Sequence, residues 1–265
     1  MATGYAARTL ICAAGVLWLG MAAIVAAFLY GERQEALDRA VVNAQALVQA
    51  LEAHTVRTFE AVDITLAGVA AGLRMSPGLA RNDARFQQAM GERLQALQPY
   101  VRSIIVVDAD GDVLHDTNYP RVPAAVRLDD REYFRAHRDD ASLERSVTGP
   151  MRSRAGLGWF VAVTRRIDAA RFRGLVLAAL QPAYFDSLYA QLKLAGDDTI
   201  VLYHRDGSVV AGYPAEAGEA GASFVRSAPF AEHLASAAAG SYTADERLVS
   251  YRALQDLPLV VALQQ

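Results

Sequence analysis

The sequence predicts an α+β protein, with a long N-terminal helical region followed by two similar units that each contain an antiparallel sheet. Two observations lead to this class. Gly31 to Leu73 lacks proline and is rich in helix-forming residues. Later, an apolar strand, an Asp-Gly turn and a second strand occur at Ser103–Leu114 and again at Thr199–Val210. The chain of 265 residues is long enough for two small domains with a core in each.

The first element is an uncharged apolar run from Thr9 to Tyr30. At about 1.5 Å per residue, its length of about 22 residues spans a bilayer core of about 30 Å. A cleavable signal peptide would have an apolar region of about 7–15 residues, so the run predicts an uncleaved transmembrane anchor. We expect residues 1–8 to form a cytoplasmic tail and the rest of the chain to be exported. The single cysteine, Cys12, lies inside this run and offers no disulfide.

Residues 31–75 predict a long helix that ends near Pro77 and Gly78. Its apolar residues recur at alternating spacings of four and three, which is typical of a heptad-like stripe. Two interpretations remain open: the stripe packs on its own domain, or it forms a dimer seam that carries motion to the membrane. A second, shorter helix is predicted over Arg85–Leu97. The stripe consists of Leu37, Val41, Ala44, Val48, Leu51, Thr55, Thr58 and Val62.

The two strand-turn-strand segments are related by one offset, since Ile104 corresponds to Ile200 and Gly111 to Gly207. Each is followed by a helical stretch and three more strands, so the chain predicts the same α+β unit twice. The expected units are 76–181 and 182–265. The helical stretches are Asp129–Asp139 and Pro229–Ala238, with a linking helix over Pro182–Leu192; the later strands lie near 145–150, 158–167 and 173–180, and near 240–243, 247–254 and 257–263.

Signals for catalysis or for a metal are weak. Asp108, Asp110 and Asp112 alternate as in a calcium loop, but the glycine stands at 111 and no glutamate closes the loop, so a hairpin turn is expected. The five histidines lack metal-ligand spacing, and no nucleophile elbow, phosphate loop or dinucleotide fingerprint occurs. We therefore expect no enzyme activity, cofactor or metal in this chain. The net charge of −3 gives no reason to expect a nucleic-acid partner.

The part of the chain after residue 30 resembles the double Cache sensor regions of bacterial transmembrane receptors, which contain two PAS-like units. Such regions precede diguanylate cyclase, histidine kinase or chemoreceptor output modules. Four local signatures in the expected order carry the resemblance. They are Asp130 to Phe134, Ser153-Arg154 with Gly158-Trp159, Gly174 to Leu177 running into Gln181-Pro182 and Tyr184-Phe185, and Leu257 to Val261.

The resemblance implies a ligand pocket in the membrane-distal unit, 76–181, beside the Arg-x-aromatic-aromatic element Arg131, Tyr133 and Phe134. An arginine can bind a carboxylate in two places, and aromatic rings supply apolar walls. Arg154, Trp159 and Arg165 would contribute from facing strands if their alternation points them inward. The alternative is that Arg131 pairs with Asp129 or Asp130 on the surface and that both aromatic residues are ordinary core.

Two positions depart from amino-acid-binding members of this family. Ala179 stands where a carboxylate would hold the ligand's ammonium group, and Val126 stands where a tyrosine is expected before the arginine. These departures favour an organic acid over an α-amino acid as the ligand.

The resulting hypothesis is that this chain is a single-pass bacterial inner-membrane protein whose periplasmic part is the sensing module of a receptor, dimerises and binds a small carboxylate. We expect the second membrane helix and the output domain to lie beyond this chain. The alternative is a PAS-like dimerisation scaffold without a ligand; an anchored hydrolase has no motif to support it.

Overall fold

The computed structural model divides the chain into two compact units, residues 1–46 and 47–265. The structure describes residues 2–75, 78, 80–123, 126–168, 170–192, 194, 196–223, 232–244 and 246–265. Within these ranges, it describes only the backbone at positions 2–17, 19, 22, 23 and 216.

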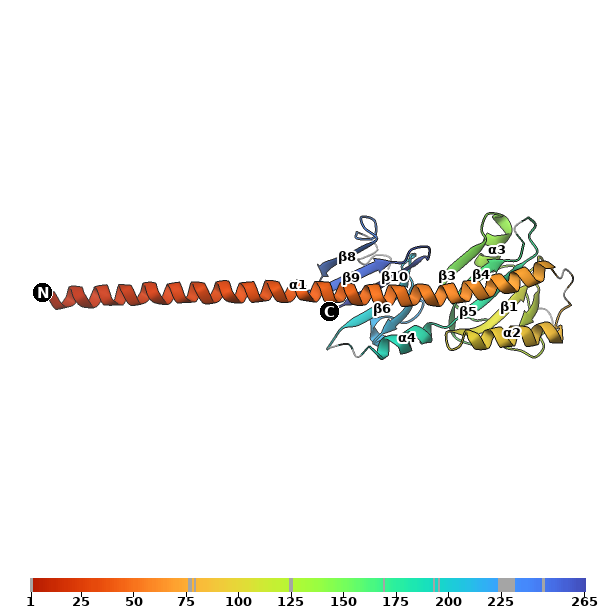
Figure 1. Cartoon of the computed structure of the whole chain (residues 1–265), viewed down its shortest axis with the longest axis horizontal. Coiled ribbons are helices and arrows are strands. Elements are labelled where there is room, and N and C mark those ends of the chain that lie inside the picture. Colours follow the sequence, from red (N-terminus) through yellow and green to blue (C-terminus); the bar gives the residue numbers. More distant parts are fainter. Residues whose placement is uncertain are drawn as a thin grey trace. The chain divides into compact units, whose positions relative to one another are not determined.

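The chain begins with one continuous helix, α1 (Ala2–Met75), so the predicted anchor and the predicted long helix form a single element (Figure 1). As far as the described residues extend, none of the helices contains an apolar stretch of the length that a bilayer crossing requires. Many side chains of the predicted anchor, residues 9–30, lie outside the described ones.

Within residues 47–265, the heptad-like stripe of α1 packs against its own domain, which contains both sheets. Val48, Leu51 and Val62 are buried, as are the polar members Thr55 and Thr58. The hydroxyl of Thr55 donates to Leu51 O at 2.8 Å and that of Thr58 to His54 O at 3.0 Å, so their burial leaves no donor unpaired. For this part of the helix, the first of the two interpretations is confirmed.

The first sheet has five antiparallel strands in the order β2-β1-β5-β4-β3. Its elements lie in one continuous stretch of chain and include all the strands predicted there. They are β1 (Val101–Val107), β2 (Val113–Asp116), β3 (Arg145–Arg152), β4 (Trp159–Arg166) and β5 (Leu175–Leu180).

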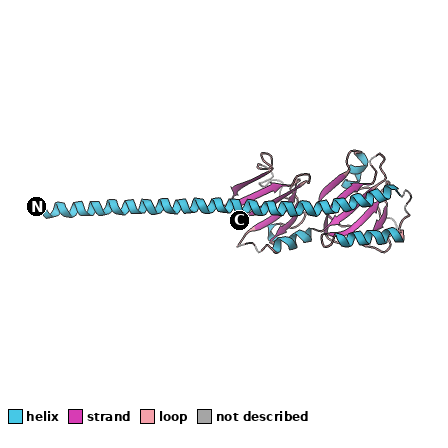
Figure 2. Cartoon of the chain, in the orientation of Figure 1, coloured by secondary structure: helices cyan, strands magenta, loops and turns pink. Residues whose placement is uncertain are grey.

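The second sheet repeats this topology, with the order β7-β6-β10-β9-β8 (Figure 2). The predicted duplication of an antiparallel unit is therefore confirmed. Its strands are β6 (Thr199–His204), β7 (Val209–Tyr213), β8 (Ala239–Ala244), β9 (Arg247–Ala253) and β10 (Leu259–Gln264).

The turns of the two β-hairpins follow the sequence repeat. Gly111 and Gly207 have φ angles of 90° and 86°, which glycine adopts without steric cost. Asp108 N donates to Asp112 O at 3.0 Å, so the aspartate-rich segment closes a hairpin as expected. Both hairpins also shift register at the same repeat position, after Val106 and after Leu202.

The shorter helices lie close to their predicted bounds. They are α2 (Ala84–Ala96), α3 (Glu132–Asp139) and α4 (Pro182–Ala190). The 3₁₀ turn η1 (Ala215–Ala217) was not predicted. The helix predicted at Pro229–Ala238 begins in residues outside the described ones, and residues 232–236 form turns. In this described part, the helix prediction is wrong.

Ion pairs attach α1 to both sheets, and aromatic contacts of His54 and Phe59 attach it to α4. Asp63 pairs with Arg165 of β4 at 2.6 Å, and Glu52 pairs with Arg252 of β9.

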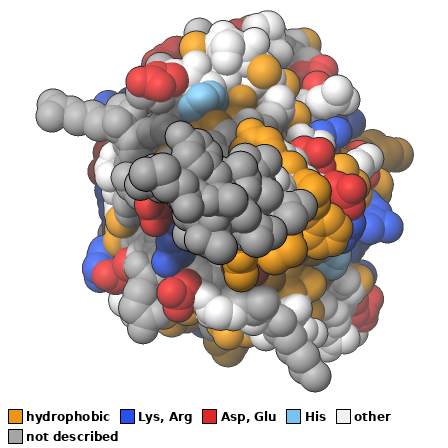
Figure 3. Space-filling view, turned by 90° about the vertical axis from the view of Figure 1, so that its left-hand side faces the viewer, with side chains coloured by type: hydrophobic (Ala, Val, Ile, Leu, Met, Phe, Trp, Pro, Cys, Tyr) orange, Lys and Arg blue, Asp and Glu red, His pale blue; other side chains and the backbone are white. Residues whose placement is uncertain are grey.

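Acidic and basic side chains are interspersed around the face drawn in Figure 3, and neither sign forms a continuous patch there.

Candidate functional site

A cavity of about 290 Å³ lies between the first sheet and the chain that covers it. We call it the distal cavity, because it lies in the unit predicted from the sequence to be membrane-distal. Sheet residues form its floor, and residues within 118–123, 126–133 and the β3–β4 connection form its other walls. Its volume lies just below the range of about 300–1,000 Å³ typical of ligand pockets, which indicates a small ligand.

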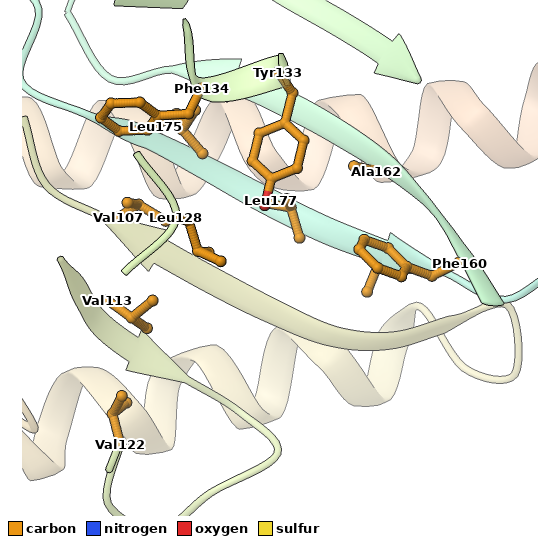
Figure 4. Packing of buried hydrophobic residues seen from close by; sticks show 11 residues of the cluster. Val107, Val113, Val122, Leu128, Tyr133, Phe134, Phe160, Ala162, Leu175 and Leu177 are labelled. Atoms are coloured by element: carbon orange, nitrogen blue, oxygen red, sulfur yellow. The ribbon is translucent and has the colours of Figure 1, made fainter. Parts of the chain in front are cut away.

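The apolar floor follows from strand alternation, since every second side chain points to the same face of a sheet. Ile105 of β1, Phe160 of β4, and Leu177 and Ala179 of β5 line the cavity. The same face continues into the hydrophobic cluster drawn in Figure 4, which includes Val107.

A register shift in β1 brings two adjacent residues into the cavity wall. Val101 pairs with Leu180 and Ser103 with Ala179, so Arg102 is an extra residue between consecutive pairs of the β1–β5 ladder. Irregularities of this kind re-aim side chains near binding sites. As a result, both Arg102 and Ser103 line the cavity, although simple alternation would place them on opposite faces.

Arg131 contributes the second guanidinium group of the cavity. It occupies the residue before α3, with an extended backbone at φ −72° and ψ 140°, and its Nη2 donates to Arg152 O at 3.3 Å. The surface alternative for Arg131 does not match the observed pairs. Asp129 accepts from Arg127 at 3.1 Å, and Asp130 pairs with Arg154.

Three polar atoms of the cavity are buried without a hydrogen-bond partner among the described residues: Nε of Arg102, Oγ of Ser103 and Nε of Arg131. An unpaired buried polar atom costs roughly 1–3 kcal/mol, and native proteins keep few of them. Their convergence on one cavity indicates that the site is built to bind a polar ligand.

One buried carboxylate also lines the cavity. Asp116 lies at the end of β2, and its Oδ1 accepts from Asn118 N at 2.9 Å. Burial raises the pKa of Asp116, whereas its bonds from Asn118 and the charge of Arg102 act in the opposite direction. Burial lowers the pKa of Arg102, because it disfavours the charged form of a base as it does that of an acid. With Arg131 and Arg154 included, three arginines and one acidic residue line the cavity.

The neighbouring aromatic residues of α3 have different environments. Tyr133 lines the cavity, and burial raises the pKa of its hydroxyl to about 12. Phe134 is buried in the hydrophobic cluster, where its ring meets Phe172 edge-on at 5.2 Å. Figure 4 shows Phe134 beside Leu175 and the ring of Tyr133 nearer to Phe160. Of the two predicted aromatic site residues, only Tyr133 therefore lines the cavity.

The remaining predicted site residues divide between the cavity and the opposite face. Arg154 lines the cavity but is half exposed and paired with Asp130. Trp159 and Arg165 share the face of β4 that is opposite to Phe160, because alternation separates odd from even positions. Arg165 pairs with Asp63 on α1 at 2.6 Å. Neither Trp159 nor Arg165 is part of the cavity wall.

The sequence reasoning missed Arg102, Ser103, Asp116 and Phe160. A usable signal was present for two of them, since Arg102 and Ser103 interrupt an otherwise apolar strand. Such polar residues in a buried strand require partners. Asp116 had no comparable signal, because acidic residues are common where a strand meets a turn.

The distal cavity is smaller than a groove of about 680 Å³ along α1, lined by Glu52, Asp63 and other residues. In the groove, however, these carboxylates are paired with arginines of the sheets. No group of three potential metal ligands occurs among the described residues. The unpaired donors, rather than volume, identify the distal cavity as the candidate site.

Residues 182–264 match the family model dCache_1_like, described as a histidine kinase sensor domain. No curated protein matches the sequence. The chain is similar to the solved extracellular domain of a candidate histidine kinase, rpHK1S-Z16, at 25% identity and a TM-score of 0.74, over 84% of this chain and 93% of that one.

Two chemoreceptor domains have a similar fold. The ligand-binding domain of PctC from Pseudomonas aeruginosa PAO1, solved with GABA, is 14% identical with a TM-score of 0.62, over 84% of this chain and 99% of that one. The domain of CtaA from Pseudomonas fluorescens, solved with L-isoleucine, is 14% identical with a TM-score of 0.60, over 86% and 90%. The predicted resemblance to double Cache sensor domains of bacterial receptors is confirmed.

Proposed function

We propose that this chain is the extracytoplasmic sensing module of a membrane-bound receptor, and that it binds a small carboxylate-bearing solute in the distal cavity. The observation that carries the proposal is the set of buried, unpaired donors on Arg102, Ser103 and Arg131 around one small cavity. A carboxylate has two oxygens that accept several hydrogen bonds, and its charge would complement the excess of guanidinium groups.

The ligand class depends on Asp116. An organic acid would use the two arginines alone, whereas GABA and L-isoleucine, the ligands named for the similar chemoreceptor domains, also carry an ammonium group. Ala179 provides no carboxylate, but Asp116 offers one from another strand. We favour an organic acid, and Asp116→Asn distinguishes the two classes. The substitution weakens binding of amino acids about tenfold or more and leaves a simple carboxylate unaffected.

We propose that this chain crosses the bacterial inner membrane once, anchored through Thr9–Tyr30, with its sheets in the periplasm. Several large apolar side chains of α1 in this segment are exposed, which supports an apolar environment for them. We further propose that the module is a homodimer and that any catalytic output belongs to a domain outside this chain. The exposed residues are Trp18, Met21, Ile24, Val25, Phe28, Leu29 and Tyr30.

A thermal-shift screen of the full chain in detergent, with organic acids, amino acids, amines and purines, tests the binding proposal. A ligand at a hundred times its dissociation constant stabilises the folded state by about 2.7 kcal/mol, which gives a visible rise in Tm. We expect shifts only with compounds that carry a carboxylate.

The matched variants are Arg131→Ala and Arg135→Ala. Arg135 is exposed on α3, the helix that follows Arg131, and does not line the cavity. Arg131→Ala weakens carboxylate binding about 100-fold, because a charge-assisted bond is lost in a buried site, and Arg135→Ala binds as the wild type does. Equal binding by both variants would refute the role of Arg131. A folded protein that responds to no compound would favour the scaffold alternative.

A further inference from the structure

The connection between β3 and β4, Ser153–Gly158, has the distal cavity on one side and the second sheet unit on the other. Ser153, Ala155 and Leu157 line the cavity. Trp159, the next residue along the chain, contacts Gly221, which belongs to a turn beside β7. This short segment therefore touches both units.

On the cavity side, both arginines proposed to bind the ligand also hold this connection. Arg131 Nη2 donates to Arg152 O at 3.3 Å, immediately before the connection. Arg102 Nη1 donates to Leu157 O, near its end. Each guanidinium group therefore uses one donor for the connection and keeps a buried Nε without a partner among the described residues.

On the other side, the contact between Trp159 and Gly221 leaves no free space. A Cβ atom placed on Gly221 would overlap Cη2 of Trp159, and Gly221 has a φ of +84°. The guanidinium of Arg152 lies 4.7 Å from the centre of the same indole ring. Trp159 is therefore held between Arg152, which accepts the bond from Arg131, and the second unit.

The turn at Gly221 is joined to the second sheet through its backbone. Gly221 N donates to Val209 O at 2.9 Å, and Val209 N donates to Ala222 O at 2.8 Å. Val209 begins β7, which is at the edge of the second sheet. A displacement of Trp159 would therefore act directly on these two hydrogen bonds.

We infer that Trp159 transmits the state of the distal cavity to the second unit. Each guanidinium group keeps its Nε free. A carboxylate that binds there draws the group toward the cavity, which weakens or redirects the bond that the group donates to the connection. The connection then changes position, and the Trp159 indole moves relative to the Gly221 turn, which alters their packing contact. That a ligand triggers this change rests on the proposed function. The path of contacts from the two arginines through Trp159 to Gly221 does not depend on it.

The simpler interpretation is that Trp159 only fills space between the two units. In that case, loss of the arginine bonds would have no effect on the second unit, and loss of Trp159 would have the same effect in every background. The two interpretations therefore differ in the energetic coupling between the arginines and Trp159, which a double-mutant cycle measures.

The experiment is backbone hydrogen exchange of residues 209–223 in the full chain, without any ligand. Arg131→Leu and Arg102→Leu should each change exchange there by about threefold or more, because they release one end of the connection. The control is Arg135→Leu, which changes an exposed arginine of α3 that does not line the cavity and should have no effect. In a Trp159→Leu background, the response to both site substitutions should disappear.

A response of equal size with and without Trp159, or no response at all, would overturn the inference. Should Trp159→Leu fail to fold, Trp159→Phe keeps an aromatic ring at the contact and should reduce the response instead of abolishing it. As an optical readout, Trp18→Phe makes Trp159 the sole tryptophan, since the chain has only two. Its emission should then shift on Arg131→Leu.

The outcomes separate this inference from the proposed function. If the exchange response is lost with Trp159 but no carboxylate binds, the contact path stands and the proposed ligand class falls. If carboxylates bind through Arg131 but the exchange response does not depend on Trp159, the sensing proposal stands and this path is wrong.

Discussion

The two sheet units share a topology but differ at the face that forms the distal cavity. In the first unit, this face is lined with Arg102, Ser103 and a small Ala179. In the second unit, the same face carries Tyr203 and Tyr251, packed with Tyr242 and Leu234. Burial raises the pKa of Tyr203 to about 12. The duplicated fold therefore presents polar groups around a cavity in one copy and packed aromatic rings in the other.

The difference begins with single positions in the repeat. Tyr203 corresponds to Val107, and Asp198 corresponds to Arg102. The β1–β5 ladder extends past Ser103 to Val101 with Arg102 as an extra residue, whereas the β6–β10 ladder begins at Thr199, the equivalent of Ser103. The two copies thus differ both in the residues of this face and in how far the ladder reaches at this end.

The largest expected effect separates the adjacent aromatic residues of the first unit. Phe134→Ala should lower the free energy of unfolding by about 3–5 kcal/mol, because a fully buried ring is removed from the core. Tyr133→Phe should cost less than about 1 kcal/mol and change mainly ligand binding. Urea denaturation of both variants measures this. If Phe134→Ala were as stable as the wild type but did not bind ligand, Phe134 would be a binding residue and not a core residue.

Filling the distal cavity should make the first unit resemble the second. Ala179→Leu adds methyl groups to the cavity floor, so a carboxylate found by the screen should bind more than about tenfold more weakly. The matched control is Gln264→Leu, since Gln264 pairs with Thr199 as Ala179 pairs with Ser103. Calorimetric titration compares the two. Unchanged affinity in Ala179→Leu would place the ligand elsewhere.

Acid should destabilise the first unit through its buried histidines. His115 and His137 are fully buried, and burial lowers the pKa of each below the ordinary value of 6.5. Below this pH the unfolded chain binds more protons than the folded one. The free energy of unfolding should therefore fall as the pH drops from about 6.5, by up to about 1.4 kcal/mol per pH unit for each histidine.

Denaturation at a series of pH values tests this, with His137→Gln as the variant. The His137 ring bonds to Leu143 O at 3.0 Å and to Thr164 Oγ1 at 2.8 Å. The variant should show a shallower dependence of the free energy of unfolding on pH between about 4.5 and 6.5. An unchanged slope would show that His137 does not contribute.

The smallest effect concerns the second unit. The hydroxyl of Tyr251 donates toward His233 O at 3.1 Å and Ala237 O at 3.2 Å, which ties the described turns to β9. Tyr251→Phe should therefore cost about 1 kcal/mol in the free energy of unfolding. Thermal denaturation measures it, with the exposed Tyr30→Phe as a control. No loss would mean that ring packing alone holds this region.

Much of the architecture could be predicted because its signals are local. An Asp-Gly turn between apolar strands encodes a hairpin through the backbone angles of Gly111 and Gly207, and its repetition reveals the duplication. Pro182 begins a helix for a similarly local reason. The prediction at Pro229–Ala238 extended the repeat beyond its local signal, and turns occupy residues 232–236.

The candidate site could be predicted only in part. Arg131, Tyr133 and Arg154 line the cavity as expected, since a short sequence element carries the first two. Phe134, Trp159 and Arg165 point elsewhere. Both faces of β4 are covered, since the adjacent residues Phe160 and Val161 are both buried. The alternation of side chains in the sequence therefore does not show which face meets α1 and which meets the cavity.

The sequence by itself thus determined the α+β class, the duplication and the helical start, since these depend on hydrophobic periodicity and turn chemistry within short windows. Tertiary structure decided the site. Arg102 and Ser103 face one cavity because of a register shift, and Asp116 joins them from β2. Such convergence depends on how distant segments pair in space, and the local pattern of any one segment carries no record of its partner.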